Sequence, residues 1–217
     1  MDFAEARRNM VESQLRTNRI SEESIILAMG KVPRERFVPE KYTSMAYIDE
    51  DLPIGRDRYL IEPMVLGRML QAVAPQSDDA ALVIGCGTGY AAAVLADLCG
   101  AVLALESDKS FLADASTLLS TLGADNAVVV EGPLDKGWAE QAPYNVILFD
   151  GAVADVPSEI CDQLAEDGRL AAVIQSDDGI GRATLMEKRG NVVSGRPLFD
   201  ATIPALPGLS KSAGFVF

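Results

Sequence analysis

The feature that most constrains the fold of this chain is an apolar run that ends in three alternating glycines. Residues 81–84 read Ala-Leu-Val-Ile, residues 85–89 read Gly-Cys-Gly-Thr-Gly, and a helix-compatible stretch follows from Tyr90 to Cys99. A second apolar run, residues 102–105, ends at Glu106. Short apolar runs joined by a helix that opens at a glycine turn are typical of a βαβ unit in a parallel sheet covered on both faces.

The same alternation continues to the C-terminus. We expect helices at 63–74, 90–99, 107–122 and 157–166, and buried strands at 81–84, 102–106, 127–130, 146–149 and 170–174. A hairpin is expected about Arg189-Gly190, and residues 213–217 are expected to close the sheet as a last strand. The pattern predicts an α/β chain with a doubly wound, mostly parallel seven-stranded sheet.

The first sixty-two residues differ from the rest. Residues 3–16 have helical periodicity, and Ser21 is expected to cap a second helix that Gly30 and Pro33 end. Prolines then mark an ordered loop with short helical turns up to Pro63. We therefore expect one domain over residues 1–217, in which residues 1–62 form a helical cap and substrate loop and residues 63–217 form the ligand-binding core.

Composition excludes several functions. The 217 residues carry 19 Lys and Arg against 32 Asp and Glu, a net charge of -13, which disfavours nucleic acid and anionic membranes as partners. The chain has no histidine, so mechanisms that need an imidazole base and most zinc sites are excluded, and we expect no metal site. Three unpaired cysteines and the lack of an apolar leader predict a cytoplasmic protein. The sequence does not indicate an oligomeric state.

The glycine loop predicts a ligand site. Gly85, Gly87 and Gly89 allow the backbone to approach a ligand closely, and Glu106 at the end of the next strand can accept both hydroxyl protons of a ribose. The alternative is that the glycines only permit a tight turn and Glu106 only caps the next helix. A dinucleotide fingerprint needs a third glycine at position 90, where this chain has Tyr90, so the spacing suits S-adenosylmethionine better than a nicotinamide cofactor.

An ordered set of segments carries a family resemblance. The segments are Arg8-Asn-Met-Val-Glu-Ser-Gln-Leu-Arg16, Val32-Pro-Arg-Glu-Arg-Phe-Val-Pro39, Leu52-Pro-Ile-Gly55, Gly85-Cys-Gly-Thr-Gly-Tyr-Ala-Ala-Ala-Val-Leu-Ala96, Gly137-Trp138 and Ala142-Pro-Tyr144. Together they resemble the protein-L-isoaspartate O-methyltransferase family. The resemblance implies a class I S-adenosylmethionine-dependent methyltransferase fold. It also implies methyl transfer to the carboxylate of isoaspartyl or D-aspartyl residues in damaged proteins or peptides.

The sequence departs from this family at the site itself. Ile61 stands at the family's serine, whose hydroxyl lies at the reacting carboxylate, and Val83 stands at an acidic position before the glycine loop. The family's Gly-Asp-Gly segment at the adenine becomes Gly132 followed by Pro133 and Leu134. Two carboxylates that the resemblance directs toward the cofactor are therefore absent.

Other residues are candidates to replace the missing groups. Asp150, after an apolar strand, is placed to attract the cofactor's ammonium or sulfonium, or alternatively caps the following turn. Arg58 and Tyr59 lie near the missing serine, and an arginine can hold a substrate carboxylate with two hydrogen bonds. Three readings stay open: an isoaspartyl methyltransferase, a methyltransferase with another carboxylate substrate, and a catalytically inactive binding or regulatory scaffold.

Overall fold

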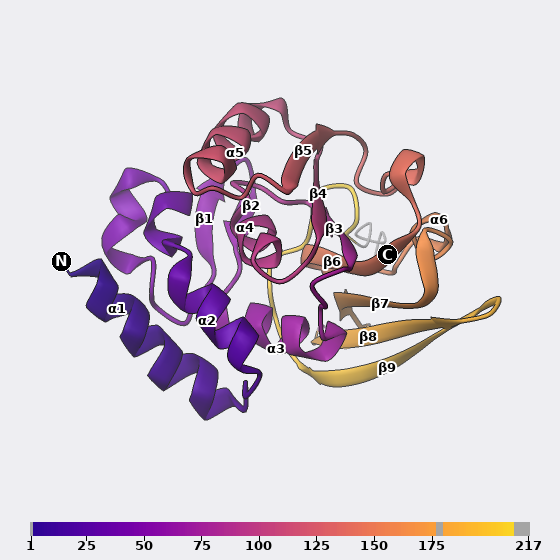
Figure 1. Ribbon diagram of the computed structural model, residues 1–217, viewed down its shortest axis with the longest axis horizontal. Coiled ribbons are helices and arrows are strands. Elements are labelled where there is room, and N and C mark those ends of the chain that lie inside the picture. Colours follow the sequence, from indigo (N-terminus) through magenta and orange to yellow (C-terminus); the bar gives the residue numbers. More distant parts are fainter. Residues whose placement is uncertain (1, 177–179, 211–217) are drawn as a thin grey trace, which may run out of the picture.

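The computed structural model describes residues 2–176 and 180–210, and its centre is a seven-stranded sheet. The strand order is β5-β4-β3-β6-β7-β8-β9, in which β3 to β7 run parallel and β8 and β9 are antiparallel to their neighbours. The N-terminal helices lie on one side of the molecule and the β8–β9 hairpin on the other (Figure 1). The predicted doubly wound, mostly parallel sheet is confirmed. The strand expected at 213–217 lies outside the described residues.

The strands follow the predicted apolar runs but are longer. Their bounds are β3 Ala80–Ile84, β4 Ala101–Glu106, β5 Ala127–Glu131, β6 Tyr144–Val153, β7 Leu164–Gln175, β8 Gly181–Arg189 and β9 Val192–Asp200. Alternate residues along the central strands enter two separate apolar clusters, one on each face of the sheet. Ile84 pairs with Leu105 on one side and Phe149 on the other, so the carboxyl ends of β3, β4 and β6 meet at one edge.

Helices cover the two faces unequally. They are α3 Pro63–Val73, α4 Tyr90–Ala96, α5 Lys109–Thr121 and α6 Ser158–Cys161. The first three pack on the face that includes Val83. Pro63 lies in the first turn of α3, as predicted. The helix expected at 157–166 is wrong beyond one turn, because Leu164 pairs with Tyr144 and already belongs to β7. That second face is completed by the C-terminal segment, through Leu206 and Leu209.

The N-terminal cap consists of short helices. They are α1 Phe3–Met10, η1 Val11–Leu15, η2 Arg16–Asn18, α2 Glu23–Lys31, η3 Arg34–Phe37 and η4 Glu40–Met45. The first expected helix is present, although its second half is a π-helix. The expected cap at Ser21 is wrong. Glu22 takes the N-cap position, and the Ser21 amide donates instead to Gln71 Oε1 at 2.7 Å.

A β-hairpin occupies part of the segment expected to be a loop. Strand β1, Leu52–Gly55, pairs antiparallel with β2, Arg58–Leu60. Arg56 and Asp57 between them both have φ of +55°, the left-handed backbone that a two-residue hairpin turn requires. Such turns usually contain Asn or Gly, so the Arg-Asp pair gave no turn signal. The hairpin carries Arg58 to the carboxyl edge of the large sheet.

A fully buried arginine holds the cap to the core. The Arg34 side chain is 0% exposed and donates to the carbonyl oxygens of Ala46 and Ile61, both at 2.7 Å. Its guanidinium carbon also lies 5.0 Å from the centre of the Tyr90 ring at the start of α4. One side chain therefore joins η4, the segment before α3, and the helix that follows the glycine loop.

We expect Arg34→Ala to lower the free energy of unfolding by about 3–5 kcal/mol, because it leaves two buried carbonyls without donors and a void beside Tyr90. Arg36→Ala, at an exposed position in the same turn, is the control and should change stability by less than about 0.5 kcal/mol. Urea unfolding of both variants measures the difference. Equal stabilities would show that Arg34 does not hold the cap.

Candidate active site

The glycine loop joins β3 to α4 as the sequence predicts. Gly85, Gly87 and Gly89 have φ of +78°, +51° and +95°, so all three adopt backbone conformations that favour glycine. The amides of Gly85 and Cys86 donate to the Leu105 carbonyl at 2.9 and 3.0 Å, which fixes the loop against the end of β4. The loop thus lies in the crevice at the carboxyl ends of the strands, where such sheets bind ligands.

Glu106 ends β4 beside this loop but is fully enclosed by the chain. Its side chain is 0% exposed, and it accepts from Arg58 Nη1 at 2.7 and 2.8 Å. It also accepts from the backbone amides of Gly87, Ser107 and Asp108 at 2.8, 2.8 and 3.1 Å. The predicted ribose role of Glu106 stays a prediction; in this structure both carboxylate oxygens already have donors.

Arg58 is the cation of this buried ion pair. Its side chain is 3% exposed, and its Nη2 donates to the carbonyl oxygen of Gly85. An ideal Cβ built on Gly85 would lie 2.9 Å from the same nitrogen. The structure therefore brings together Arg58, Gly85, Gly87 and Glu106, which come from the hairpin, the loop and β4. The predicted contact of Arg58 with an acceptor carboxylate stays a prediction.

Two apolar side chains that the sequence reasoning missed complete the enclosure. Residues 204–209 run beside the end of β6: the Ala152 amide donates to Pro204 at 2.9 Å and the Leu206 amide to Ala152 at 2.8 Å. Leu206 then lies 2.6 Å from an ideal Cβ on Gly85, and Ile54 lies 2.7 Å from one on Gly87. Ile54 lies inside a segment quoted for the family resemblance, whereas no motif marks Leu206. The space that the glycines leave is filled by the chain itself.

Asp150 lies near the end of β6 with a carboxyl group 6% exposed. Its Oδ1 has no hydrogen-bond partner among the described residues. Burial raises the pKa of Asp150 to about 7, although the positive charges of Arg58 and Arg34 act to lower it. A buried acceptor without a donor suits the predicted contact with a ligand ammonium, which stays a prediction.

The remaining predicted site residues are dispersed. Ile61 is 1% exposed and follows β2, while Tyr59 is half-buried in the hairpin. Leu134 is buried in the apolar cluster of the second face, whereas its neighbour Pro133 is exposed. Among the described residues, the side-chain hydrogen-bond partners of Arg58 and Glu106 include none of these four. Arg34 donates to the Ile61 carbonyl. It lies inside a segment that carries the family resemblance, but the sequence alone predicted no role for it.

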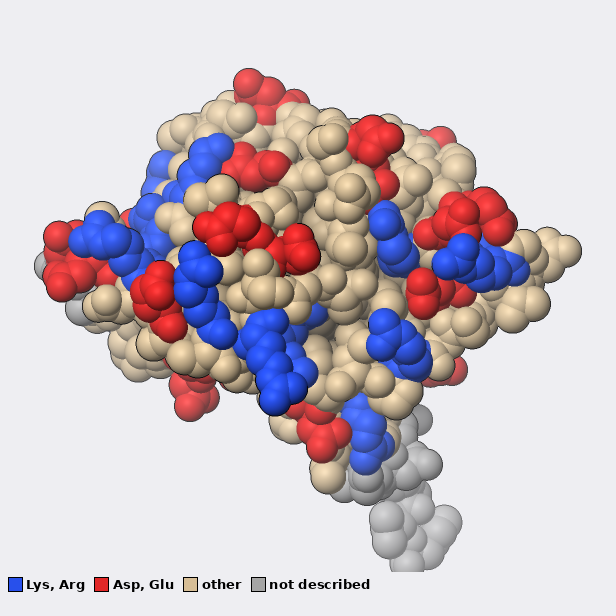
Figure 2. Space-filling view, turned by 60° about the horizontal axis from the view of Figure 1, so that its bottom comes forward, with Lys and Arg blue, Asp and Glu red and all other residues tan. Residues whose placement is uncertain are grey.

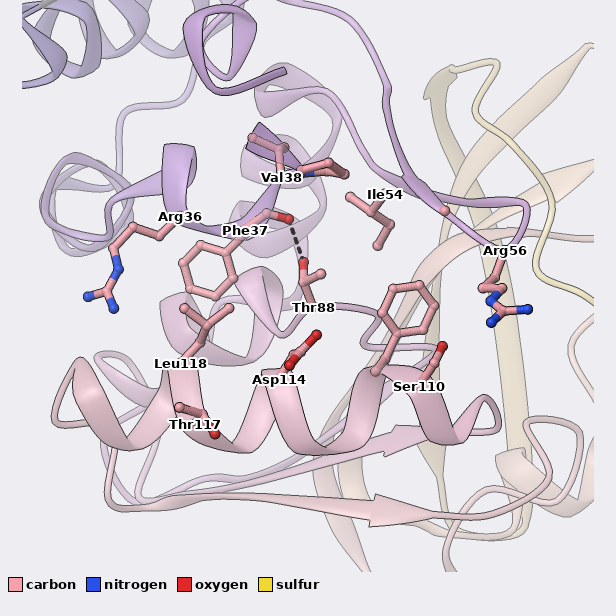
Figure 3. A pocket seen from close by; sticks show the side chains of 13 residues that line it. Arg36, Phe37, Val38, Ile54, Arg56, Thr88, Ser110, Asp114, Thr117 and Leu118 are labelled. Carbon is pink, nitrogen blue, oxygen red and sulfur yellow. Dashed lines mark hydrogen bonds between the residues drawn. The ribbon is translucent and has the colours of Figure 1, made fainter. Parts of the chain in front are cut away.

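A separate pocket of about 530 Å³ lies on the other side of the hairpin (Figure 3). Phe37, Ile54 and Phe111 are among its lining residues, Asp114 points into it from α5, and the Thr88 hydroxyl donates to the Phe37 carbonyl at 2.8 Å. Ile54 thus faces this pocket as well as the glycine loop. Arg56 of the hairpin lines this pocket and also a second one, of about 430 Å³, which Arg58 and Glu106 line.

Three further features of the described residues bear on function: the distribution of charge, the length of the helices and the grouping of possible metal ligands. Figure 2 shows acidic and basic side chains interspersed over one face, so that face has no broad area of one sign. Across residues 2–176 and 180–210, no helix is long and apolar enough to cross a bilayer. The same residues contain no group of three or more His, Cys, Asp or Glu side chains that could hold a metal ion.

In this conformation the protein's own side chains hold the groups that S-adenosylmethionine would need. The cofactor would need the surface of the glycine loop and the carboxylate of Glu106. Arg58 occupies both, and Leu206 and Ile54 fill the space over Gly85 and Gly87. The backbone of the site matches the expected cofactor, but the side chains that cover it would have to move.

Comparison with known proteins gives consistent results. The family model for protein-L-isoaspartate(D-aspartate) O-methyltransferase matches residues 5–200. Protein-L-isoaspartate O-methyltransferase 2 of Anaeromyxobacter sp. (strain Fw109-5) is 43% identical over 164 residues, which cover 76% of this chain and 68% of the relative. The Opitutus terrae enzyme of the same name is 36% identical over 198 residues, covering 91% and 83%.

Solved structures agree with this assignment. A protein-L-isoaspartate O-methyltransferase superposes with a TM-score of 0.84 at 26% identity, covering 94% of this chain and 67% of that one. A Plasmodium falciparum protein of that designation, in complex with S-adenosyl-L-homocysteine, gives a TM-score of 0.74 at 20% identity, covering 95% and 98%. The second likeness concerns the fold alone.

The strand order and the glycine loop are those of a class I methyltransferase. The family model and the relatives above narrow this class further. The chain belongs to the protein-L-isoaspartate(D-aspartate) O-methyltransferase family.

The raised pKa of Asp150 predicts a pH-dependent cost to stability. Between the unfolded pKa near 3.8 and the folded value of about 7, the folded protein holds a proton that the unfolded chain has lost. This proton contributes to the stability of the folded state. The contribution is fully present below the unfolded pKa and is lost as the pH rises through 7. Asp150→Asn places an uncharged side chain of the same shape at this position at every pH. The free energy of unfolding of this variant, relative to that of the parent, should therefore rise by roughly 2 kcal/mol from pH 5 to pH 8. Urea unfolding at both pH values measures this rise, and a constant difference would contradict the raised pKa.

Proposed function

We propose that this chain is an S-adenosylmethionine-dependent protein carboxyl methyltransferase that acts on isoaspartyl or D-aspartyl residues of damaged proteins, as a cytoplasmic repair enzyme. The observation that carries the proposal is the family match over residues 5–200, combined with a glycine loop and an acidic strand end that meet at the carboxyl edge of the sheet. The named relatives cover most of the chain, including this edge.

The proposed reaction needs no general base from the protein's side chains. A carboxylate is already a nucleophile at neutral pH, and S-adenosylmethionine would supply an activated methyl group, so no general base is needed. Rate enhancement then comes from alignment of the two reactants and from exclusion of water. A chain without histidine is therefore compatible with this chemistry.

We assign the site roles to an open form in which Arg58 has left Glu106. In that form Gly85, Gly87 and Gly89 would line the cofactor, Glu106 would accept from its ribose, and Asp150 would face its ammonium group. Pro133 and Leu134 would lie toward the adenine. The released Arg58 guanidinium, next to Tyr59, would then be available to an acceptor carboxylate.

A second candidate function is a non-catalytic scaffold that binds or regulates other proteins. Glu106 without free acceptor capacity, and a buried apolar side chain at position 61, favour it. A methyltransferase with a different carboxylate substrate would also fit the loss of the hydroxyl. These alternatives differ in whether methyl transfer occurs and to which acceptor.

Methyl transfer to an isoaspartyl peptide is the direct test. With radiolabelled S-adenosylmethionine, we expect slow formation of a base-labile methyl ester on the isoaspartyl peptide, at least about tenfold above the same peptide with normal aspartate. The normal peptide controls for non-specific esterification. Equal labelling of the two peptides would point to another acceptor, and no labelling together with no cofactor binding would favour the scaffold.

A second test concerns the missing hydroxyl. A hydrogen bond to a charged group contributes about 1.5–3 kcal/mol, so Ile61→Ser should raise the rate of isoaspartyl methylation by about tenfold or more. Ile61→Ala removes a similar volume without adding a hydroxyl and is the matched control. If the two variants have the same rate, the hydroxyl is not what the site lacks.

A further inference from the structure

The carboxylate of Glu106 has no remaining capacity for a ligand. A carboxylate offers about four lone-pair sites, and six donor contacts from Arg58, Gly87, Ser107 and Asp108 use them, the Ser107 hydroxyl at 3.4 Å being the longest. The three amides belong to the loop and to the residues directly after Glu106, so they move only with the sheet edge. Arg58 is 48 positions away and reaches Glu106 from the hairpin. It is the one charged donor of the set, and it can leave without disturbing the strand.

The position of Arg58 coincides with the position that a cofactor needs. Its two terminal nitrogens bind Glu106 and the Gly85 carbonyl, so the guanidinium spans the first part of the glycine loop. A ribose that binds Glu106 would have to displace it. The hairpin that carries Arg58 has solvent-exposed turn residues and borders the open pocket of about 530 Å³, so there is room for it to shift.

Leu206 reinforces the closure from the opposite side. It lies over Gly85, and its segment is held by hydrogen bonds to the end of β6. An ideal Cβ on Gly151 would lie 2.7 Å from Leu206 Cδ2, so a side chain at position 151 would displace Leu206 from this position. Arg58 and Leu206 thus come from separate parts of the chain and both lie against Gly85.

We propose that Arg58, with Leu206, is a built-in competitor for the cofactor crevice. The closed form is the resting state, and S-adenosylmethionine binds only to the fraction of molecules in which Arg58 has released Glu106. This inference rests on the proposed function. The apparent dissociation constant is then the intrinsic one divided by the open fraction, so a variant that cannot close binds more tightly with no new contact.

Calorimetric titration with S-adenosylhomocysteine tests the competition, after mass spectrometry shows that none has copurified. We expect Arg58→Ala to lower the dissociation constant at least tenfold relative to the parent, and Leu206→Ala to lower it by a smaller factor. Lys31→Ala is the matched control, since it removes a cation from an exposed ion pair with Asp97 at 2.7 Å, and its affinity should equal that of the parent.

The outcomes separate this inference from the proposed function. Tight binding by the parent with no gain in either variant overturns the competition and leaves the methyltransferase standing, as does weaker binding by Arg58→Ala. A folded Arg58→Ala variant that binds no S-adenosylhomocysteine overturns the competition and the proposed cofactor together. Circular dichroism before each titration shows that the variants are folded.

A measurement on the unmodified chain keeps the proposal testable if Arg58→Ala does not fold. Hydrogen exchange of residues 52–60 should accelerate at saturating S-adenosylhomocysteine, because the hairpin must leave Glu106 for the ligand to bind. The amides of residues 192–200, in the distant β9 strand, should not change. Bound ligand with unchanged exchange in the hairpin would overturn the competition.

Discussion

The buried ion pair between Arg58 and Glu106 is the interaction on which the geometry of the crevice depends. The guanidinium and the carboxylate are both almost without solvent contact, and each also binds backbone of the glycine loop. Removing one member of such a pair leaves an uncompensated charge, whose cost is about 3–5 kcal/mol. The pair therefore couples the hairpin, the loop and β4, and it determines whether the crevice is closed by the protein or available to a ligand.

The departures from the family pattern are consistent with a crevice that is closed for much of the time. Val83 and Ile61 stand at positions where the resemblance implies polar residues, and both are buried, at 0% and 1% exposure. A polar side chain that serves a ligand is left without a partner when the ligand is absent and water is excluded, and this costs about 1–3 kcal/mol for each group. Apolar replacements avoid that cost. Asp150 has a carboxyl oxygen without a hydrogen-bond partner among the described residues, and burial raises its pKa.

Much of the sheet could be predicted because its signals are local. Apolar runs, the glycine turn and Pro63 each carry their own physical cause, and the structure has the corresponding elements. The exceptions arise where distant pairing decides the outcome. Residues 164–166 were expected to be helical but begin β7, where Leu164 pairs with Tyr144 of β6. The hairpin forms around an Arg-Asp turn that lacks the usual glycine.

The same distinction between local signals and distant contacts applies to the site. The rule that ligands bind at the carboxyl ends of parallel strands placed Gly85, Glu106 and Asp150 in one crevice. No local pattern could pair Arg58 with Glu106, since their contact requires the unpredicted hairpin, or bring Leu206 back over Gly85 from the far end of the chain. Each of these contacts spans 48 positions or more and exists only in the folded protein.

Under the proposed competition, the equilibrium between the closed form, in which Arg58 binds Glu106, and the open form therefore separates a scaffold from an enzyme. If the closed form is favoured by about 1.4 kcal/mol, one molecule in roughly ten is open and the apparent cofactor affinity falls about tenfold. If it is favoured by about 4 kcal/mol, the loss approaches a thousandfold, and binding fails at ordinary cofactor concentrations. The glycine loop and the sheet edge are the same in both cases. Under the proposed competition, the strength with which Glu106 prefers Arg58 over a ribose therefore decides between an enzyme and a scaffold.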